Sequence, residues 1–495
     1  MTKATTTTTV LAAALAACSS LQSVPQAPAP VIPAHYGADA AAEPGGGADP
    51  RLVSGAAPPP RWWTQYQCAA LDDLVDEALA RNASLGAARA ELRAAREQLR
   101  AQIGENALPH IDVGLDGSRQ RALVQPFLPQ PTYLYDVFAA QAQLSYTFDF
   151  FGAAVLADRS LAARVEQQRF ELESIRRSIA AQLVLATIDA AALQAQIAAT
   201  SELIDAVERR AAQNAQRSSQ GSLAAAEALT SEADAAAARG LLPPLRARLR
   251  VVRHAQAVLL GRNPQDAPEP LPLESLHLPD PVPVEVPSEL LHRRPDVLAA
   301  EAAMRAAADA AGAATASMFP SLTLSASYGR GGFDWSTLAS PAGALWSAGA
   351  LITQPLFHGG ALAARRRQYQ AGYEAAAAQY RQTVLSAFQN VADTLADLDA
   401  DAAALAQARR GALASQRIRD DLQARHALGS AALVTALAAR EQYESAHVRL
   451  IAAQAAQLAD TAQLYQALGE ATLSEQRVAV SRAPGPVSTD RSGRR

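Results

Sequence analysis

The stretch VPSELLHRRPDVLAAEAAMRAAADAAGAATASMFPSLTLSASY, residues 286–328, decides the fold of this chain. Its periodicity changes once, at Phe319-Pro320. Before that proline the apolar residues recur at helical spacing, and Pro295 followed by Asp296 suits the first turn of a helix. After it, apolar residues alternate with threonine and serine up to Tyr328. The stretch therefore predicts a helix that leads directly into a strand with one apolar and one polar face.

The same order of elements occurs once before, about two hundred residues earlier, which indicates an internal repeat. There the segment ELRAA, residues 91–95, corresponds to AMRAA, residues 303–307, and Leu108-Pro109 ends the helix as the later proline does. The sequences RSSQGS, residues 217–222, and RHALGS, residues 425–430, also correspond. Each repeat therefore reads as helix, strand, strand, long helix, glycine turn and long helix.

The composition excludes several classes of protein. With 495 residues and a formal net charge of −4, the chain has no basic surplus that would favour nucleic acid. Alanine is abundant and aromatic residues make up only 5%, which favours long, closely packed helices. No uninterrupted apolar run of about 18 residues occurs, so no membrane-spanning helix is predicted. Even the most apolar helical window, 179–199, contains Gln182, Asp189 and Gln194.

The N-terminus reads as an export signal that ends at a lipidated cysteine. Lys3 precedes a mildly apolar segment, and Leu15-Ala16-Ala17-Cys18 resembles a bacterial lipobox, whose cysteine is acylated and becomes the mature N-terminus. Ser19, where aspartate would retain a lipoprotein in the inner membrane, favours the outer membrane. The alternative is an ordinary signal peptide with a chance cysteine. If Cys18 is acylated, Cys68 has no partner for an intrachain disulfide.

Two strands are predicted in each repeat, at 110–122 and 137–150, and at 321–332 and 345–357. In the second of these, apolar residues alternate with Gln, Ser, Thr and Asp over about a dozen positions, which suits a tilted transmembrane strand between lipid and a wet lumen. A strand pair on a soluble core is the alternative. Four strands are too few to close a membrane barrel, and unpaired strand edges are costly in lipid. The chain is therefore expected to oligomerise, and three copies would supply twelve strands.

Long helices are predicted before and after the strand pairs. Residues 71–105 are predicted to form one amphipathic helix, and residues 152–216 form another without internal Gly or Pro. Gly221 reverses the chain, and Pro243 and Pro244 interrupt the returning helix. The corresponding positions of the second repeat are Gly360 to about Leu428 for the long helix, Gly429 for the turn and Gly469 for the end of the return helix.

These signals divide the chain into six segments. The first and last are a processed leader and a polar tail, and the two repeats are joined by a connector rich in proline. The predicted boundaries are 1–17 for the signal peptide, 18–61 for the lipidated tether, 62–264 for the first repeat, 265–287 for the Pro-rich connector, 288–470 for the second repeat and 471–495 for a disordered tail.

The signature residues resemble those of a known family. VPSELLHRRPD at 286–296, Ala300-Glu301, Arg305-Ala306-Ala307 and FPSL at 319–322 are similar to the pattern of the outer-membrane efflux lipoproteins, the exit channels of tripartite multidrug pumps. The resemblance covers nearly all of the chain from Trp62 to Gly469. It implies an α+β membrane protein, a homotrimer with a 12-stranded outer-membrane β-barrel continued by a long periplasmic α-helical barrel. It also implies a periplasmic adapter protein and an inner-membrane efflux transporter as partners.

The two glycine turns are the candidate functional positions. Glycine permits the positive φ that a tight helix reversal needs, so a turn alone would explain both. The resemblance implies that the turns are periplasmic tips, where the channel closes and the adapter docks. The candidate docking and gate residues are Gln220, Gly221, Ser222, Leu428, Gly429 and Ser430. Some relatives carry an acidic gate residue just after the second glycine, whereas this chain has Ser430-Ala431-Ala432. Asp420 and Asp421, about two turns upstream, could substitute and are the candidate acidic gate.

Enzymatic function is not expected. Glu289-x-x-His292 and Glu444-x-x-His447 have the spacing of di-iron helix motifs, but such a site needs carboxylates from two further helices. No phosphate-binding loop, nucleophile elbow or paired-cysteine motif is present in the sequence. The cluster Arg293-Arg294-Pro295-Asp296 is interpreted as a helix start. We therefore expect no catalytic residues, no metal and no cofactor.

The sequence thus predicts a passive outer-membrane exit channel that exports drugs or other small toxic compounds from the periplasm. It would sit in the outer membrane by its barrel and lipid anchor and extend into the periplasm. Two alternatives stay open. One is the outer-membrane channel of a protein secretion system, and the other is a periplasmic coiled-coil scaffold without a pore.

Overall fold

The structure is a computed structural model that describes residue 32 and residues 52–54, 58–123, 132–284 and 287–469. The predicted signal peptide, the lipidation at Cys18 and the predicted tail from residue 471 lie outside the described residues. The chain divides into two compact units. The first contains residues 90–169 and 299–381, and the second contains the remaining described residues up to 469.

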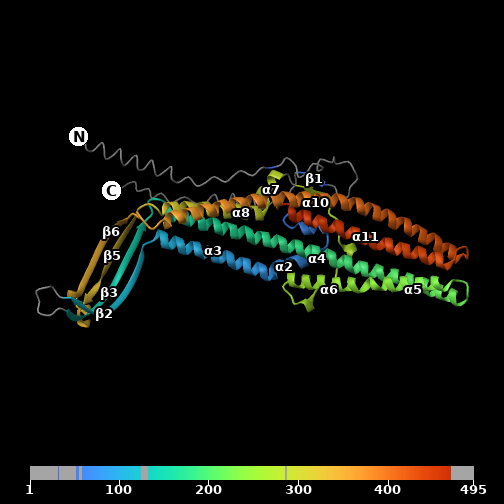
Figure 1. The fold of residues 1–495 in the computed structure, drawn as a ribbon, viewed down its shortest axis with the longest axis horizontal. Helices are drawn as coiled ribbons and strands as arrows, with labels where there is room; N and C mark the ends of the chain where they lie inside the picture. The colour runs from blue at the N-terminus through green and yellow to red at the C-terminus, as the bar shows by residue number, and fades with distance from the viewer. Residues whose placement is uncertain (1–31, 33–51, 55–57, 124–131, 285–286, 470–495) are drawn as a thin grey trace, which may run out of the picture. The chain divides into compact units, whose positions relative to one another are not determined.

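The first unit contains a four-stranded antiparallel sheet with the order β2-β3-β5-β6 (Figure 1). All four predicted strands are present. The two largest differences from the predicted bounds are that β3 begins earlier, at Thr132, and that β6 ends earlier, at Thr353, because Pro355, just beyond it, has no N–H to donate to a partner strand. The strands are β2 (His110–Leu123), β3 (Thr132–Phe148), β5 (Ser321–Gly332) and β6 (Ala344–Thr353).

Helices adjoin the sheet in both repeats. Helix α8 (Pro295–Ala316) leads into β5, and α3 (Ala83–Ala107) leads into β2, as the repeat pattern predicts. Gly312 lies so close to α4 (Ala153–Ser219) that an added Cβ would stand 3.1 Å from the Leu156 side chain. The loop between β5 and β6 adds two short helices that the sequence did not predict, α9 (Trp335–Ala339) and η4 (Pro341–Gly343).

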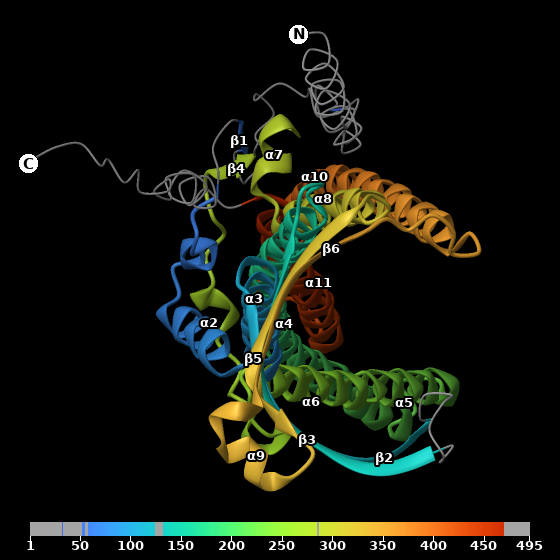
Figure 2. The same ribbon diagram turned by 90° about the vertical axis from the view of Figure 1, so that its left-hand side faces the viewer.

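The second unit is built on a row of long helices. An apolar cluster of Leu193 and Leu249 joins α4 to α6, and a cluster of Val207 and Ala235 joins α4 to α5. On its other side α4 meets α11, which in turn packs against α10. The row therefore runs α5/α6, α4, α11, α10 (Figure 2). These helices are α5 (Ala225–Gly240), α6 (Leu242–Leu259), α10 (Ala361–Ala427) and α11 (Leu433–Ala467).

Helix α4 contains one stretch that is long and apolar enough to cross a membrane by length and composition. However, 56% of that stretch is buried inside the protein, against α6 and its neighbours. This burial is typical of the core helix of a helical domain, and Gln182 and Asp189 lie on the less buried surface of α4.

One predicted helix is two helices. Residues 71–105 were expected to form a single helix, but α2 (Ala69–Arg81) ends at Asn82 and α3 starts at Ala83. Asn82 has extended backbone angles, and its Oδ1 accepts from the N–H of Ser84 at 2.9 Å while its Nδ2 donates to the Leu259 carbonyl at 2.9 Å. An asparagine that competes for backbone groups in this way starts a new helix. By contrast, the break predicted at Pro243 is confirmed, because α5 ends at Gly240 and α6 begins at Leu242.

Three described residues of the predicted tether form a strand, and the start of the first repeat packs against α11. Strand β1 (Leu52–Ser54) pairs in parallel with β4 (Val282–Val284) of the connector. Trp62 stacks on Tyr465 with ring centroids 5.3 Å apart, and the Tyr66 hydroxyl donates to the Leu458 carbonyl at 2.9 Å. The remaining short elements are η1 (Trp62–Tyr66), η2 (Pro264–Asp266), η3 (Leu273–Ser275) and α7 (Pro287–Arg293).

Candidate functional site

The sheet has two chemically different faces. The strand register places Val113, Ala142, Tyr328 and Trp346 in one row across all four strands. Of these side chains, Val113 is 83% exposed and Trp346 is 77% exposed, so the described chain does not cover this apolar face. An aqueous environment would not favour such a surface, whereas lipid would.

The opposite face of the sheet is polar. The adjacent row, one residue along, contains Asp112, Gln143, Ser327 and Ser347. The hydroxyls of Ser327 and Ser347 are 2.9 Å apart and share a hydrogen bond. Strands β2 and β6 are the edges of this sheet and pair with no further strand among the described residues. The sheet is thus a segment with one face for lipid, one face for water and two edges available for pairing.

The two helix reversals have the same backbone structure. Gly221 and Gly429 both have φ of +72°, the left-handed conformation that favours glycine. The Gly221 N–H donates to the Ser218 carbonyl at 2.9 Å, and the Gly429 N–H donates to the His426 carbonyl at 2.9 Å. The next residue in each turn donates its N–H five residues back, which completes a Schellman cap. The predicted correspondence of the two turns therefore holds at the level of single hydrogen bonds.

The serine after each glycine has a role that the sequence reading did not assign. Ser222 donates its hydroxyl to the Arg217 carbonyl at 3.0 Å, and Ser430 donates its hydroxyl to the Arg425 carbonyl at 3.0 Å. Each serine therefore satisfies a carbonyl at the end of its helix with both its N–H and its O–H. The Arg-x-x-x-Gly-Ser pattern, which occurs at both turns, is the sequence signal for these hydrogen bonds from serine to the arginine carbonyl.

The remaining tip candidates lie on the surface. Leu428 is 83% exposed, and Gln220 is exposed at the equivalent position of the first turn. Asp420 and Asp421 are already in ion pairs on α10, with Arg419 at 2.7 Å and with Arg425 at 2.9 Å. Both carboxylates are more than half exposed, so they remain accessible from solvent. A role for either in a gate stays a prediction.

Two buried arginines form a structural centre that the sequence reading underestimated. Arg294 binds both carboxylate oxygens of Asp296, at 2.6 and 3.0 Å, and donates to the Ala467 carbonyl at 2.9 Å. Arg177 donates to the carbonyls of Tyr465 and Leu468. Burial alone would raise the pKa of Asp296, but the hydrogen bonds and charge of Arg294 hold it below its usual value. The predicted helix start is confirmed, and the same residues also satisfy the C-terminal carbonyls of α11.

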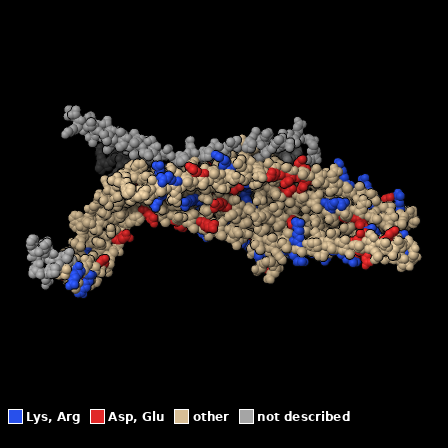
Figure 3. All heavy atoms as spheres, in the orientation of Figure 1, with Lys and Arg blue, Asp and Glu red and all other residues tan. Residues whose placement is uncertain are grey.

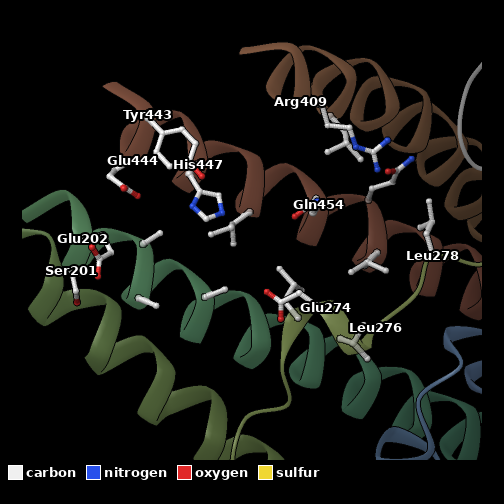
Figure 4. A pocket seen from close by; sticks show the side chains of 18 of the residues that line it. Ser201, Glu202, Glu274, Leu276, Leu278, Arg409, Tyr443, Glu444, His447 and Gln454 are labelled. Carbon is white, nitrogen blue, oxygen red and sulfur yellow. The ribbon is translucent and has the colours of Figure 1, made fainter. Parts of the chain in front are cut away.

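A cavity with a volume of about 850 Å³ lies between α4, α10, α11 and the connector (Figure 4). Glu202 from α4 and Glu444 from α11 lie on its wall beside Tyr443 and His447. Glu444 is buried, and this burial raises its pKa although the Arg440 guanidinium acts in the opposite direction. An ion pair of 2.7 Å between Arg440 and Glu202 joins the two helices here.

The cavity does not assemble a metal site from the two Glu-x-x-His motifs. Glu289 is on α7 and pairs with Arg293 of the same helix, whereas Glu444 faces Arg440 on α11. In the described ranges no group of three or more His, Cys, Asp or Glu side chains has an arrangement that could hold a metal ion. The motifs thus have the spacing of a di-iron site without its further carboxylates.

The fold and the two-faced sheet define a class, that of two-repeat outer-membrane channels with long helical extensions. The family model for outer membrane efflux proteins matches residues 74–261 and 286–470, one match for each repeat. The chain belongs to the outer membrane efflux protein family.

Relatives and solved structures agree with this assignment. The chain is 29% identical over 417 residues to the pyoverdine export outer membrane protein OpmQ of Pseudomonas aeruginosa, covering 83% of this chain and 87% of that protein. It is 30% identical over 457 residues to the outer membrane protein OprJ of the same organism, covering 89% and 87%. The solved structure of the outer-membrane channel OprN is similar with a TM-score of 0.78 at 26% identity, covering 90% of this chain and 98% of that one.

Proposed function

We propose that the protein is the passive outer-membrane exit channel of a tripartite efflux pump, working as a homotrimer. The single observation that supports it best is the four-stranded sheet, whose apolar face is uncovered and whose two edge strands, β2 and β6, each have one edge without a partner strand in the described chain. Three such sheets joined edge to edge would close a 12-stranded barrel, because an exposed strand edge in lipid costs several kcal/mol per unpaired group.

The rest of the pump would act through the helical part. A periplasmic adapter protein would dock at the tips around Gly221 and Gly429, and an inner-membrane transporter would supply the energy. The exported class is drugs or other small toxic compounds, in line with relatives named for export of pyoverdine and for efflux of antibiotics and toluene. No bond chemistry takes place in the channel. Acylation at Cys18 would add a lipid anchor in the outer membrane.

The first experiment is native mass measurement of the detergent-purified protein together with single-channel recording in a planar bilayer. A trimer with discrete openings supports the proposal. A monomer that extracts without detergent overturns it in favour of the periplasmic scaffold. To separate drug efflux from protein secretion, the gene is expressed in a strain that lacks its own efflux channel, and resistance and export of a secreted protein are measured side by side.

The tips have a test of their own. Gly429→Val forces a β-branched residue into the left-handed region, at a cost of about 1–3 kcal/mol, and should distort the turn and reduce drug resistance. Gly429→Asn is the matched control, because asparagine tolerates this conformation. Equal resistance for both variants at equal protein level would show that this turn is not a docking or gate position.

A further inference from the structure

The arginines of the four-stranded sheet all lie on its apolar face. Successive residues of a strand point to opposite faces, so the register assigns each charged residue to a face. Asp112 and Asp116 fall in the rows of the polar face. The strand arginines fall instead in the rows of the apolar face, and they are Arg119, Arg121 and Arg330. On a face that meets lipid, arginine is costly at the middle of the membrane and nearly neutral at its boundary, so the position of each arginine along its strand decides its effect.

The uncharged part of this face has the height of a membrane. From Phe148 to Phe138, a rise of ten residues, β3 contains no charged residue. At about 3.4 Å per residue and a tilt of about 40°, this span rises about 26 Å, close to the apolar band of outer-membrane barrels, which is about 25 Å tall. Arg119 is opposite Asp136, beyond that span, and Arg121 is two residues farther along β2. In the proposed barrel both arginines therefore stand at the boundary of the hydrocarbon region.

Arg330 begins lower on the sheet but extends toward the same end. It is opposite Ala140, inside the uncharged span of β3. Its guanidinium donates to the Leu338 carbonyl of α9 at 3.4 Å, and α9 follows the end of β5. A long arginine side chain can lie along an apolar surface while its charged head reaches the boundary. Figure 3 shows basic side chains gathered at the end of the sheet that lies away from the helices.

Helix α9 adds a tryptophan to the same face. Gly332 and Phe138 are opposite each other and belong to the apolar face. A Cβ added to Gly332 would clash with the Thr337 side chain of α9, and Trp335 packs on Phe138 with ring centroids 4.6 Å apart. Trp335 is still 61% exposed. Tryptophan is enriched where membrane meets water, because its ring is apolar and its N–H is polar, so Trp335 indicates the same boundary as Arg119.

The chain leaves these arginines with a surplus of positive charge. Arg119 and Asp136 form an ion pair at 3.7 Å, but the Arg119 side chain stays 69% exposed, and such a surface pair contributes little. Arg121 is exposed and has no ion pair within the described ranges. The sequences that connect β2 to β3 and β5 to β6 contain one acidic residue, Asp334, which caps α9. An anionic group from outside the chain is therefore the partner that fits this surface.

We propose that an outer rim formed by Arg119, Arg121, Arg330 and Trp335 binds the phosphate groups of lipid A, the anionic glycolipid of the outer leaflet. The inference rests on the proposed barrel, in which the helices extend into the periplasm and this end of the sheet meets the outer leaflet. Guanidinium groups bind phosphate oxygens in pairs, and basic side chains near an anionic lipid surface are attracted to it. The glycolipid thus offsets the charge that the chain leaves unpaired.

Native mass spectrometry of the full-length protein in detergent measures this binding, in a titration with lipid A that carries both phosphates. Arg119→Gln with Arg121→Gln should weaken binding about 25-fold, because each arginine at an anionic lipid surface contributes about a fivefold preference. Arg119→Lys with Arg121→Lys should keep most of the binding, since both charges remain. The matched control is Arg93→Gln with Arg96→Gln, which removes two exposed arginines from α3 and should bind as the wild type does.

Two further lipids test the chemistry of the ligand. Lipid A without phosphates should bind the wild type much more weakly than the phosphorylated form. Equal affinity for the two forms, or an equal loss in the two glutamine double variants, overturns the lipid site. Phosphatidylglycerol is the third probe. If it binds as tightly as lipid A and depends on the same arginines, the assignment to the glycolipid of the outer leaflet is wrong.

The mass of the protein separates failure of this site from failure of the channel. A trimer whose binding of lipid A does not depend on phosphate overturns the outer rim as a lipid site and leaves the exit channel standing. A monomer that extracts without detergent overturns the barrel and, with it, the outer rim.

Discussion

Arg294 connects three parts of the chain that are far apart in sequence. Its guanidinium binds Asp296 at the start of α8 and the Ala467 carbonyl at the end of α11, and it lies near the Ala387 carbonyl of α10 at 3.5 Å. The side chain is only 9% exposed. A buried arginine in this position is stable only because each of its partners is itself a group that needs a donor.

Replacing Arg294 by methionine should therefore destabilise the protein. Arg294→Met keeps the packing of the side-chain stem but leaves Asp296 and the α11 carbonyl without their donor, at a cost of about 2–3 kcal/mol. The loss is read as a lower melting temperature by circular dichroism in detergent. Arg305→Met is the control, because the ion pair of Arg305 with Glu166 is nearly half exposed. Its loss should lower the free energy of unfolding by less than about 1 kcal/mol. Equal melting temperatures for the two variants would contradict the buried role of Arg294.

Single residues differ in how much of their role is visible in the sequence. Gly221 and Gly429 were predictable as turns because only glycine adopts their backbone conformation at low cost, and the pattern occurs twice. The role of Arg294 as a partner of α11 was not predictable. Arg294 and Ala467 are 173 residues apart, and a local sequence pattern cannot predict a contact between residues so far apart.

At the scale of elements, the α10–α11 pair contains a titratable cluster. Burial, the adjacent carboxyl of Asp401 and the charge of Asp397 raise the pKa of Asp460 to about 7. The unfolded chain would release this proton near pH 4, so between about pH 4 and 7 the folded state binds more protons than the unfolded state. This group therefore favours folding at low pH, and its contribution declines as the pH rises through that window.

Asp460→Asn should remove this dependence. The variant should melt at a higher temperature than the wild type at pH 8, and the difference should shrink toward pH 5, where the wild-type carboxyl is protonated. Glu97→Gln, on the exposed surface of α3, should show no such trend. A constant difference between Asp460→Asn and wild type from pH 5 to 8 would contradict a raised pKa at this position.

A helix or strand was predictable where its apolar residues kept a single spacing along its whole length. The change from helical to alternating spacing at Phe319-Pro320 located the end of α8 and the start of β5 correctly. The break at Asn82 was missed because its apolar neighbours keep helical spacing across it. One of the hydrogen bonds that hold Asn82 goes to the Leu259 carbonyl, which is 177 residues away in the sequence. Pairing of β1 with β4 was missed for a different reason, because three-residue strands are too short to show a periodicity of their own.

At the scale of the whole molecule, the two faces of the sheet should respond oppositely to charge. Ala142→Arg places a cation on the apolar face, at a cost of about 2–4 kcal/mol if that face meets lipid, and should reduce the amount of protein assembled in the outer membrane. Gln143→Arg changes the next residue, on the polar face, and should be tolerated. Membrane fractionation and heat-modifiable migration on gels measure both. Similar loss for both variants would contradict a lipid-facing row at Ala142.

The two tips of each chain have the same backbone conformation but expose different side chains. Gln220 exposes an amide at one tip, and Leu428 exposes an apolar side chain, 83% accessible, at the other. In the proposed trimer, a ring of three copies would therefore present six tips of two chemically different kinds, three with the exposed amide of Gln220 and three with the exposed side chain of Leu428. The internal duplication of the chain thus doubles the number of tip surfaces without making them equivalent.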